Sequence, residues 1–157
     1  MTYHIRVRAG ALILENESIL LVEFKDEKGL HYNLPSGGVE PGESIIEAVR
    51  REAEEEASVD VEVGPLAFVY EYAPHLTPQR YGDTHSLGLM FDCKIKEGSI
   101  PMMPEQPDLY QTDVTWVKLT ELKNIVLYPN MKDQIIAYSK DKKPLGFIEE
   151  QTLKEYI

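Results

Sequence analysis

The chain has 157 residues, 43% of them hydrophobic and 27% charged, which is typical of one folded domain over residues 1–157. Its formal net charge of −11 argues against general nucleic-acid or membrane-surface binding, because both polyanionic partners need a basic footprint. No apolar run approaches the roughly 20 residues of a membrane span, and the polar start MTYHIRVRAG is unlike a signal peptide. Cys93 is the single cysteine, which excludes internal disulfides and favours a cytoplasmic protein.

Short apolar runs between polar turns predict β-strands in the first part of the chain. The expected strands are residues 5–14, 19–22 and 31–34. Pro35 ends the third strand, and Ser36, Gly37 and Gly38 are expected to form a flexible loop.

An amphipathic helix is predicted next. Ser44 and Glu47, three residues apart, form a capping box at its start. Apolar residues at helical spacing predict the buried stripe, which consists of Ile46, Val49, Ala53 and Ala57. The acidic residues of the helix are expected on the opposite face.

The remainder of the chain predicts further strands and a second helix. The expected strands are residues 61–63, 66–72, 86–95 and 113–119. Residues 97–107 contain three prolines and are expected to form a loop, and residues 131–138 a helix. Strands on both sides of an amphipathic helix predict an α/β fold in which helices cover a mixed sheet.

The first helix carries an unusual concentration of negative charge. Seven carboxylates lie between Glu40 and Glu56, and Glu52, Glu55 and Glu56 recur at i, i+3 and i+4. This spacing places the three on one helical face, where like charges repel. A run of acidic residues is usually a solvated face, but a hard divalent cation with oxygen ligands would also relieve the repulsion.

The pattern around that helix distinguishes these two interpretations. From Gly37 the order is glycine, five residues, Glu43, seven residues and then REAEEEASV, which begins at Arg51. This resembles the signature of the Nudix hydrolases, G-x5-E-x7-R-E-U-x-E-E-x-G-U, where U is aliphatic. Every charged position matches, and Ser58 replaces the glycine that ends the helix, a tolerable change at a C-cap. Flanking segments extend the resemblance over roughly residues 6–140.

The resemblance implies a Nudix-fold α/β/α sandwich with a mixed β-sheet between helices. It also implies an enzyme that cleaves a phosphoanhydride bond in a nucleoside diphosphate linked to another group, by attack of water at phosphorus. The substrate would be a small-molecule nucleotide, either a nucleoside triphosphate or an ADP-sugar-like compound. Mg²⁺, with Mn²⁺ as an alternative, would neutralise the phosphate oxygens. A homodimer is compatible with the resemblance.

Individual roles follow from the matched positions. The metal-ligating positions of the family correspond to Glu52, Glu55 and Glu56, and Glu52 or Glu56 could also orient or deprotonate the water. Glu43 and Arg51 correspond to a pair that braces the loop against the helix. Gly37 and Gly38 are expected to let the loop backbone approach the metal and phosphate.

Weaker candidates lie outside the signature. Family members often add a catalytic carboxylate from a later loop, and Glu97 is the best-placed candidate, followed by Glu71 and Glu105; an ordinary surface role is the alternative for each. Gln111 stands where many relatives carry glutamate, so no base is expected there. Arg8 and Arg80 are candidates to bind a substrate phosphate. Four tyrosines could stack on a base or simply belong to the core: Tyr70, Tyr72, Tyr81 and Tyr128.

Two other functions stay open. A catalytically inactive nucleotide-binding or sensor module could share this fold, but such domains usually lose signature glutamates, and none is lost here. Removal of RNA caps is a third function, against which the acidic composition and the lack of a basic groove argue.

Overall fold

The computed structural model describes residues 4–77 and 80–156. Its strands are β1 (Arg6–Glu15), β2 (Ser18–Asp26), β3 (Gly29–Asn33), β4 (Ser36–Gly38), β5 (Val61–Tyr72), β6 (Ser86–Ile95), β7 (Gln111–Lys118) and β8 (Gly146–Glu149). Its helices are α1 (Ile45–Ala57) and α2 (Lys132–Asp141), with 3-10 turns η1 (Leu119–Asn124) and η2 (Glu150–Thr152).

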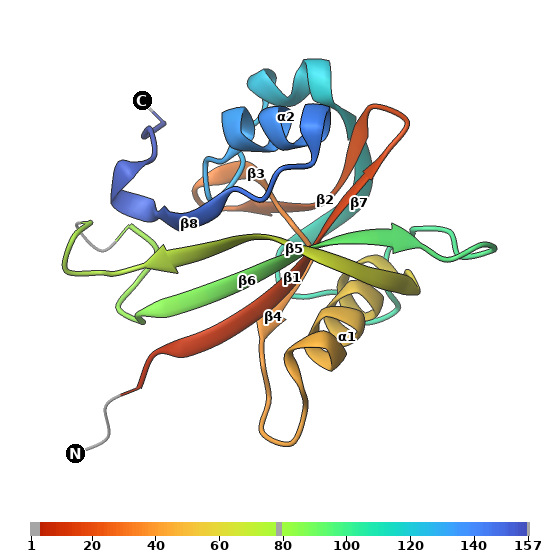
Figure 1. The fold of residues 1–157 in the computed structure, drawn as a ribbon, viewed down its shortest axis with the longest axis horizontal. Coiled ribbons are helices and arrows are strands. Elements are labelled where there is room, and N and C mark those ends of the chain that lie inside the picture. Colours follow the sequence, from red (N-terminus) through yellow and green to blue (C-terminus); the bar gives the residue numbers. More distant parts are fainter. Residues whose placement is uncertain (1–3, 78–79, 157) are drawn as a thin grey trace.

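The strands form one mixed eight-stranded sheet with the path β3-β2-β1-β6-β5-β8, to which β4 adds beside β1 and β7 beside β2. The pairs β1–β6 and β5–β8 are parallel. Helices α1 and α2 lie on opposite sides of this sheet (Figure 1). The predicted α/β/α sandwich with a mixed sheet is therefore confirmed. None of the helices in the described residues has the length and hydropathy needed to cross a membrane.

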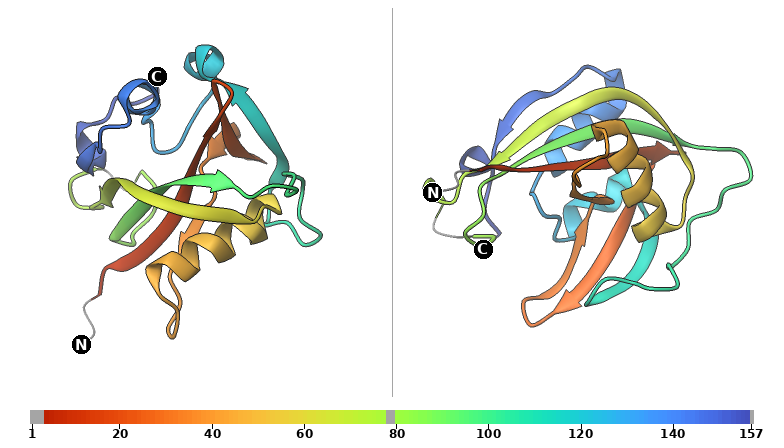
Figure 2. Two further views of the ribbon diagram at one scale, coloured as in Figure 1. Left: turned by 45° about the vertical axis from the view of Figure 1, so that its right-hand side comes forward. Right: turned by 90° about the horizontal axis from the view of Figure 1, so that it is seen from below.

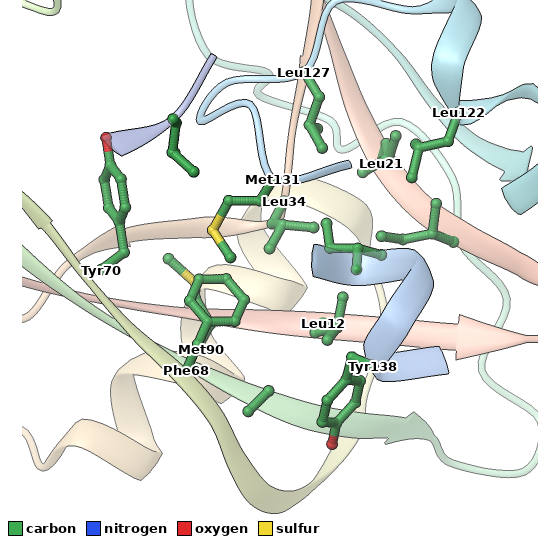
Figure 3. Close-up of a cluster of buried hydrophobic side chains, with 14 of the residues drawn as sticks. Leu12, Leu21, Leu34, Phe68, Tyr70, Met90, Leu122, Leu127, Met131 and Tyr138 are labelled. Atoms are coloured by element: carbon green, nitrogen blue, oxygen red, sulfur yellow. The ribbon is translucent and has the colours of Figure 1, made fainter. Parts of the chain in front are cut away.

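Strand β1 separates two hydrophobic cores because its side chains alternate between the two faces of the sheet. Leu12 points into the core beneath α2, together with Phe68, Met90 and Tyr138 (Figure 3). On the other face, small side chains allow α1 to lie close to the sheet. Residues of this second core include Ala9, Ala11, Val49, Ala53 and Cys93.

Cys93 is the free thiol of the chain, and the structure buries it in the core beneath α1, where it is 1% exposed. Burial raises the pKa of this thiol to about 12. The expectation of a small buried hydrophobic residue, rather than a nucleophile, agrees with this position.

Several predicted elements need correction. Residues 36–38 are not a flexible loop, since they pair with β1 as the short strand β4. The expected strands 61–63 and 66–72 are one strand, β5, whose register against β6 shifts between Val63 and Leu66. Strand β8 was not predicted. In each case, backbone pairing with a neighbouring strand overrides a weak local signal.

The face of α1 that packs on the sheet also differs from the prediction. Val49, Ala53 and Ala57 are buried as expected, but Ile46 is 36% exposed. Glu52 and Glu56, expected opposite the apolar stripe, are 8% and 6% exposed. The stripe therefore continues through two carboxylates, and α1 presents acidic groups to the interior.

Candidate active site

Both ends of α1 are fixed by hydrogen bonds within the signature. The Ser44 hydroxyl accepts a hydrogen bond from the Glu47 amide at 3.1 Å, and the Glu47 carboxylate accepts one from the Ser44 amide at 2.9 Å. This is the predicted capping box. At the other end, Ser58 adopts the left-handed conformation with φ 58°. Serine thus occupies the backbone conformation for which glycine is favoured, and the helix still ends there.

The structure places Arg51 and Glu43 in the expected contact between the entry segment and α1. Arg51 donates from Nε to Glu43 Oε2 at 2.9 Å and from Nη2 to Glu43 Oε1 at 2.6 Å. Its Nη2 also donates to the Gly38 carbonyl at 3.0 Å. These hydrogen bonds from Arg51 lower the pKa of Glu43 to about 2. Arg51 therefore joins the end of β4 to the helix.

The third nitrogen of Arg51 contacts the predicted metal ligands. Its Nη1 donates to Glu52 Oε1 at 2.7 Å and to Glu55 Oε2 at 3.2 Å. Glu52 is buried, whereas Glu55 is exposed. The guanidinium thus draws both carboxylates toward the same side of the helix.

Glu56 is held differently, by backbone rather than by a cation. Its Oε1 accepts a hydrogen bond from the Ser36 amide at 2.7 Å. Burial is the main cause that raises its pKa to about 8. Burial also raises the pKa of Glu52, although the hydrogen bond from Arg51 opposes that shift. Two carboxylates are therefore held where a positive charge would stabilise their ionised forms.

Gly37 and Gly38 allow close approach rather than flexibility. A Cβ on Gly37 would lie 2.2 Å from Glu52 Oε1, and a Cβ on Gly38 would lie 2.1 Å from Arg6 Nη2. Both glycines belong to β4 and pair with β1. A side chain at position 37 would displace the Glu52 carboxylate. Both positions require glycine because neighbouring side chains occupy the space of a Cβ atom. The expectation of a flexible loop at these residues was wrong.

The donors on α1 fit a hard divalent cation, because Glu52, Glu55 and Glu56 offer carboxylate oxygens from one face of a helix. Among residues 4–77 and 80–156, however, no three His, Cys, Asp or Glu side chains form a group that could hold a metal ion. Glu52 and Glu55 instead contact Arg51. Arg51 contacts one oxygen of each of these carboxylates, Glu52 Oε1 and Glu55 Oε2, and its other partner is Glu43.

The segment between β6 and β7 covers the C-terminal end of α1. Gln111 donates from Nε2 to the Glu56 carbonyl at 2.9 Å, and the Met102 amide donates to the Ala57 carbonyl at 3.1 Å. Glu105 and Asp108 from this segment line a cavity of about 750 Å³ together with Arg51, Glu55 and Ser58. Asp108 also contributes to the raised pKa of Glu56, after burial and the charge of Glu52.

The candidate loop carboxylates lie in two different cavities. Glu97, the expected catalytic residue, lines a different cavity with Glu15 and Trp116. Asp108, which no local pattern distinguishes, lies beside Glu56 because Gln111, three residues later, is bonded to the backbone of α1. Glu105, one of the two candidates that followed Glu97, lines the cavity at the end of α1 together with Asp108.

Ser36 also lines a second pocket of about 350 Å³, and the four tyrosines named as candidates for base stacking all line it too. The rings of Tyr72 and Tyr81 are 5.5 Å apart, and those of Tyr81 and Tyr128 are 5.3 Å apart. Arg8 and Asn33 also line the pocket. We refer to this cavity as the tyrosine pocket.

Of the remaining candidate site residues, Arg8 lines the tyrosine pocket, whereas Arg80 and Glu71 contact other charged side chains. Arg8 lines the tyrosine pocket, where a phosphate could reach it. Arg80 instead forms ion pairs with the buried Glu150 and with Glu155, so its guanidinium is already neutralised. Glu71 contacts His85 at 2.9 Å. The structure thus gives Arg80 two carboxylate partners, and its phosphate-binding role stays a prediction.

Comparisons with known proteins agree with these features. A family profile for the NUDIX domain matches residues 4–138. The chain is 32% identical over 127 residues to the nucleoside triphosphatase NudI of Enterobacter sp. (strain 638), a match that covers 74% of this chain and 84% of that protein. A shorter match, 42% identical over 68 residues, covers 43% of this chain and 21% of the human 8-oxo-dGDP phosphatase NUDT18.

Solved structures show the same fold. A NUDIX hydrolase from Nitrosomonas europaea has a TM-score of 0.72 and 24% identity, with 98% of each chain covered. An ADP-ribose pyrophosphatase from Streptococcus suis has a TM-score of 0.65 and 20% identity, with 92% of this chain and 99% of that chain covered. At these identities the likeness concerns the arrangement of the sheet and helices.

Proposed function

Since this chain belongs to the Nudix hydrolase family, we propose that it is a Mg²⁺-dependent enzyme that hydrolyses a phosphoanhydride bond in a small nucleotide. The observation that carries the proposal is the position of Ser36. Its amide holds Glu56, and the same residue lines the tyrosine pocket. A nucleotide whose base lies among the tyrosines would thus direct its phosphates toward the acidic face of α1.

The residues of the site divide the work of hydrolysis. Glu52, Glu55 and Glu56 would hold Mg²⁺, which when bound neutralises charge on the phosphate oxygens. Arg51 keeps Glu43 as its partner and fixes α1 against β4. Glu52 or Glu56 would orient the attacking water or accept its proton, and Arg8, which lines the tyrosine pocket, would bind a phosphate.

The loop carboxylate is a separate part of the proposal. Asp108 and Glu105, rather than Glu97, would supply it, because they lie beside the end of α1. A carboxylate there could accept a proton or complete the ligands of the cation, since oxygen donors suit both roles.

A nucleoside triphosphate is the favoured substrate class, because the NudI match covers most of both chains and that relative is a nucleoside triphosphatase. An ADP-sugar-like diphosphate is the second class, suggested by the fold likeness to an ADP-ribose pyrophosphatase. The sensor alternative is disfavoured because every charged residue of the signature is present. Cytoplasmic location is part of the proposal, since a reducing compartment suits an unpaired thiol such as Cys93.

A nucleotide panel with Mg²⁺ and Mn²⁺ tests this function. We expect hydrolysis of at least one nucleoside triphosphate or ADP-sugar-like compound, and its loss in Glu55→Gln and Glu56→Gln. Glu54→Gln, on the exposed face of the same helix, is the matched control and should retain activity. Full activity in both test variants would contradict the assignment of the metal ligands.

A further inference from the structure

Residues 146–156 follow the matched NUDIX profile, which ends at residue 138, yet they contact Tyr70 and Tyr128, two of the residues that line the tyrosine pocket. Strand β8 pairs in parallel with β5, in the register Phe68↔Gly146 to Glu71↔Glu149. Figures 1 and 2 show this blue segment along the end of β5. The pairing brings Ile148 of β8 beside Tyr70, which lines the pocket.

A buried carboxylate anchors this segment. Glu150 is fully buried at 0% exposure, and its Oε1 accepts a hydrogen bond from the Tyr70 hydroxyl at 2.6 Å. Figure 3 shows Tyr70 at the edge of the core with its hydroxyl directed toward the C-terminal segment. The Arg80 guanidinium forms an ion pair with Glu150 Oε2 and another with Glu155. A buried carboxylate needs such partners, so Glu150 fixes Tyr70 and Arg80 together.

Tyr81, the residue after Arg80, is one of the aromatic residues that line the tyrosine pocket. The Tyr81 amide donates to the Tyr72 hydroxyl at 3.0 Å, and that hydroxyl donates to the Gly82 carbonyl at 2.7 Å. The Tyr81 ring then lies between those of Tyr72 and Tyr128. Arg80 and Tyr72 therefore hold Tyr81 from both of its sides.

Tyr156 supports the opposite wall. Its hydroxyl accepts a hydrogen bond from the Leu127 amide at 2.8 Å and lies 3.0 Å from the Asn130 side-chain oxygen. Its ring meets the Tyr128 ring edge to face, with centroids 5.9 Å apart and an interplanar angle of 76°. Tyr128 is thus held from outside the pocket by the end of the chain.

We propose that residues 146–156 are a specificity element that sets how tightly the enzyme holds the nucleoside part of its substrate. Glu150 and Tyr156 are positioning residues that act through Tyr70, Tyr81 and Tyr128. The inference rests on the proposed function, in which the base occupies the tyrosine pocket. Because the chemistry takes place at α1, loss of either positioning residue weakens substrate binding and leaves the chemical step intact.

The test uses Glu150→Gln and Tyr156→Phe in the full chain, with the best nucleotide from the panel. We expect KM to rise about tenfold, kcat to stay within about twofold, and the Mg²⁺ concentration for half-maximal rate to stay the same. Glu62→Gln, the same change at an exposed position of β5, is the matched control and should leave all three values unchanged. Calorimetric titration with the same nucleotide gives the affinity comparison without turnover.

The outcomes separate this inference from simpler explanations. General loosening of the fold would lower kcat and shift the Mg²⁺ requirement together with KM, and would overturn the inference. Unchanged KM and affinity in the folded variants would overturn it as well. If Glu150→Gln does not fold, Tyr156→Phe decides, since it removes one hydroxyl and keeps the ring. A wild-type protein that hydrolyses no nucleotide would instead contradict the proposed function.

Discussion

Glu52 and Glu56 are carboxylates that folding removes from water on the inner face of α1. Burial raises the pKa of both groups, and only one strong donor opposes it in each case: Arg51 for Glu52, and the Ser36 amide for Glu56. A bound cation would reverse this penalty, because it favours the ionised form of every carboxylate that it contacts. Metal binding would therefore stabilise the ionised forms of Glu52 and Glu56, which their hydrogen-bond donors stabilise only in part.

The titration of Glu56 gives a pH-dependent prediction for the metal-free protein. Its pKa is about 8 in the folded state and 4.5 for an exposed carboxyl group in the unfolded chain, so the unfolded chain loses this proton first as the pH rises. The contribution of Glu56 to stability should therefore be most favourable below pH 4.5 and should decline up to about pH 8. Thermal unfolding in EDTA should show this decline in wild type relative to Glu56→Gln. A constant difference in Tm between the two proteins over that range would contradict it.

Gly37 provides a second prediction at the residue scale. In Gly37→Ala the new Cβ would lie within 2.2 Å of Glu52 Oε1, so the carboxylate must move. Misplacement of a catalytic group by about 1 Å can reduce activity about 100-fold, and we expect a loss of that order in kcat. Gly98→Ala is the control, since nothing lies within 4 Å of its Cβ and its φ of +87° affects stability alone. Activity measured beside Tm distinguishes the two changes.

Among the helices and strands, sequence patterns correctly predicted the features that depend on contacts between residues close together in the chain. The strand over residues 86–95 and the capping box of Ser44 were both predicted correctly, because alternation and capping involve neighbours in sequence. The four-residue strand β8 was missed, and β4 was predicted to be a loop, since two of its three residues are glycines. Pairing with a distant strand, rather than propensity, forms both elements.

The candidate site shows the same division. The resemblance to the Nudix signature predicted the contact between Arg51 on α1 and Glu43, which lies just before the helix begins. It did not predict that Asp108 would approach Glu56, or that Glu97 would lie elsewhere. The position of this loop depends on a hydrogen bond between residues far apart in the sequence, from the side-chain amide of Gln111 to the Glu56 carbonyl.

Arg51 joins β4 to α1. The neighbouring residue Arg50 allows the same substitution to be made as a control. Arg51→Lys keeps the charge but cannot reproduce the two-point contact with Glu43 and the bond to Gly38. Loss of a residue that orients metal ligands typically costs about 10–100-fold in activity, and we expect kcat/KM to fall within this range. Arg50→Lys, at an exposed position of the same helix, should have no measurable effect. Equal losses in the two variants would show that the brace has no specific role.

The whole molecule has 27 acidic and 16 basic residues, so its negative charge is in excess unless it binds cations. Self-repulsion of a net charge of −11 destabilises the compact state, and α1 adds its own local repulsion. Divalent metal should therefore stabilise the fold as well as support catalysis.

Thermal unfolding with and without Mg²⁺ measures this effect. At a Mg²⁺ concentration 100 times its Kd, specific binding contributes about 2.7 kcal/mol, which for a chain of this size raises Tm by about 5–11 °C. NaCl at equal ionic strength is the control for simple screening. Glu52→Gln combined with Glu56→Gln should abolish the difference between the two salts. An equal response to both salts in wild type would indicate screening alone.

The burial of Cys93 has a practical consequence for spectroscopy. The chain has one thiol, it is 1% exposed, and its pKa is about 12, so maleimide and other thiol-directed reagents should leave it unmodified in the folded protein. A cysteine introduced at Leu109, which is 78% exposed in the segment that covers α1, would then be the one reactive position. A fluorophore or spin label could be attached there without first removing the native residue.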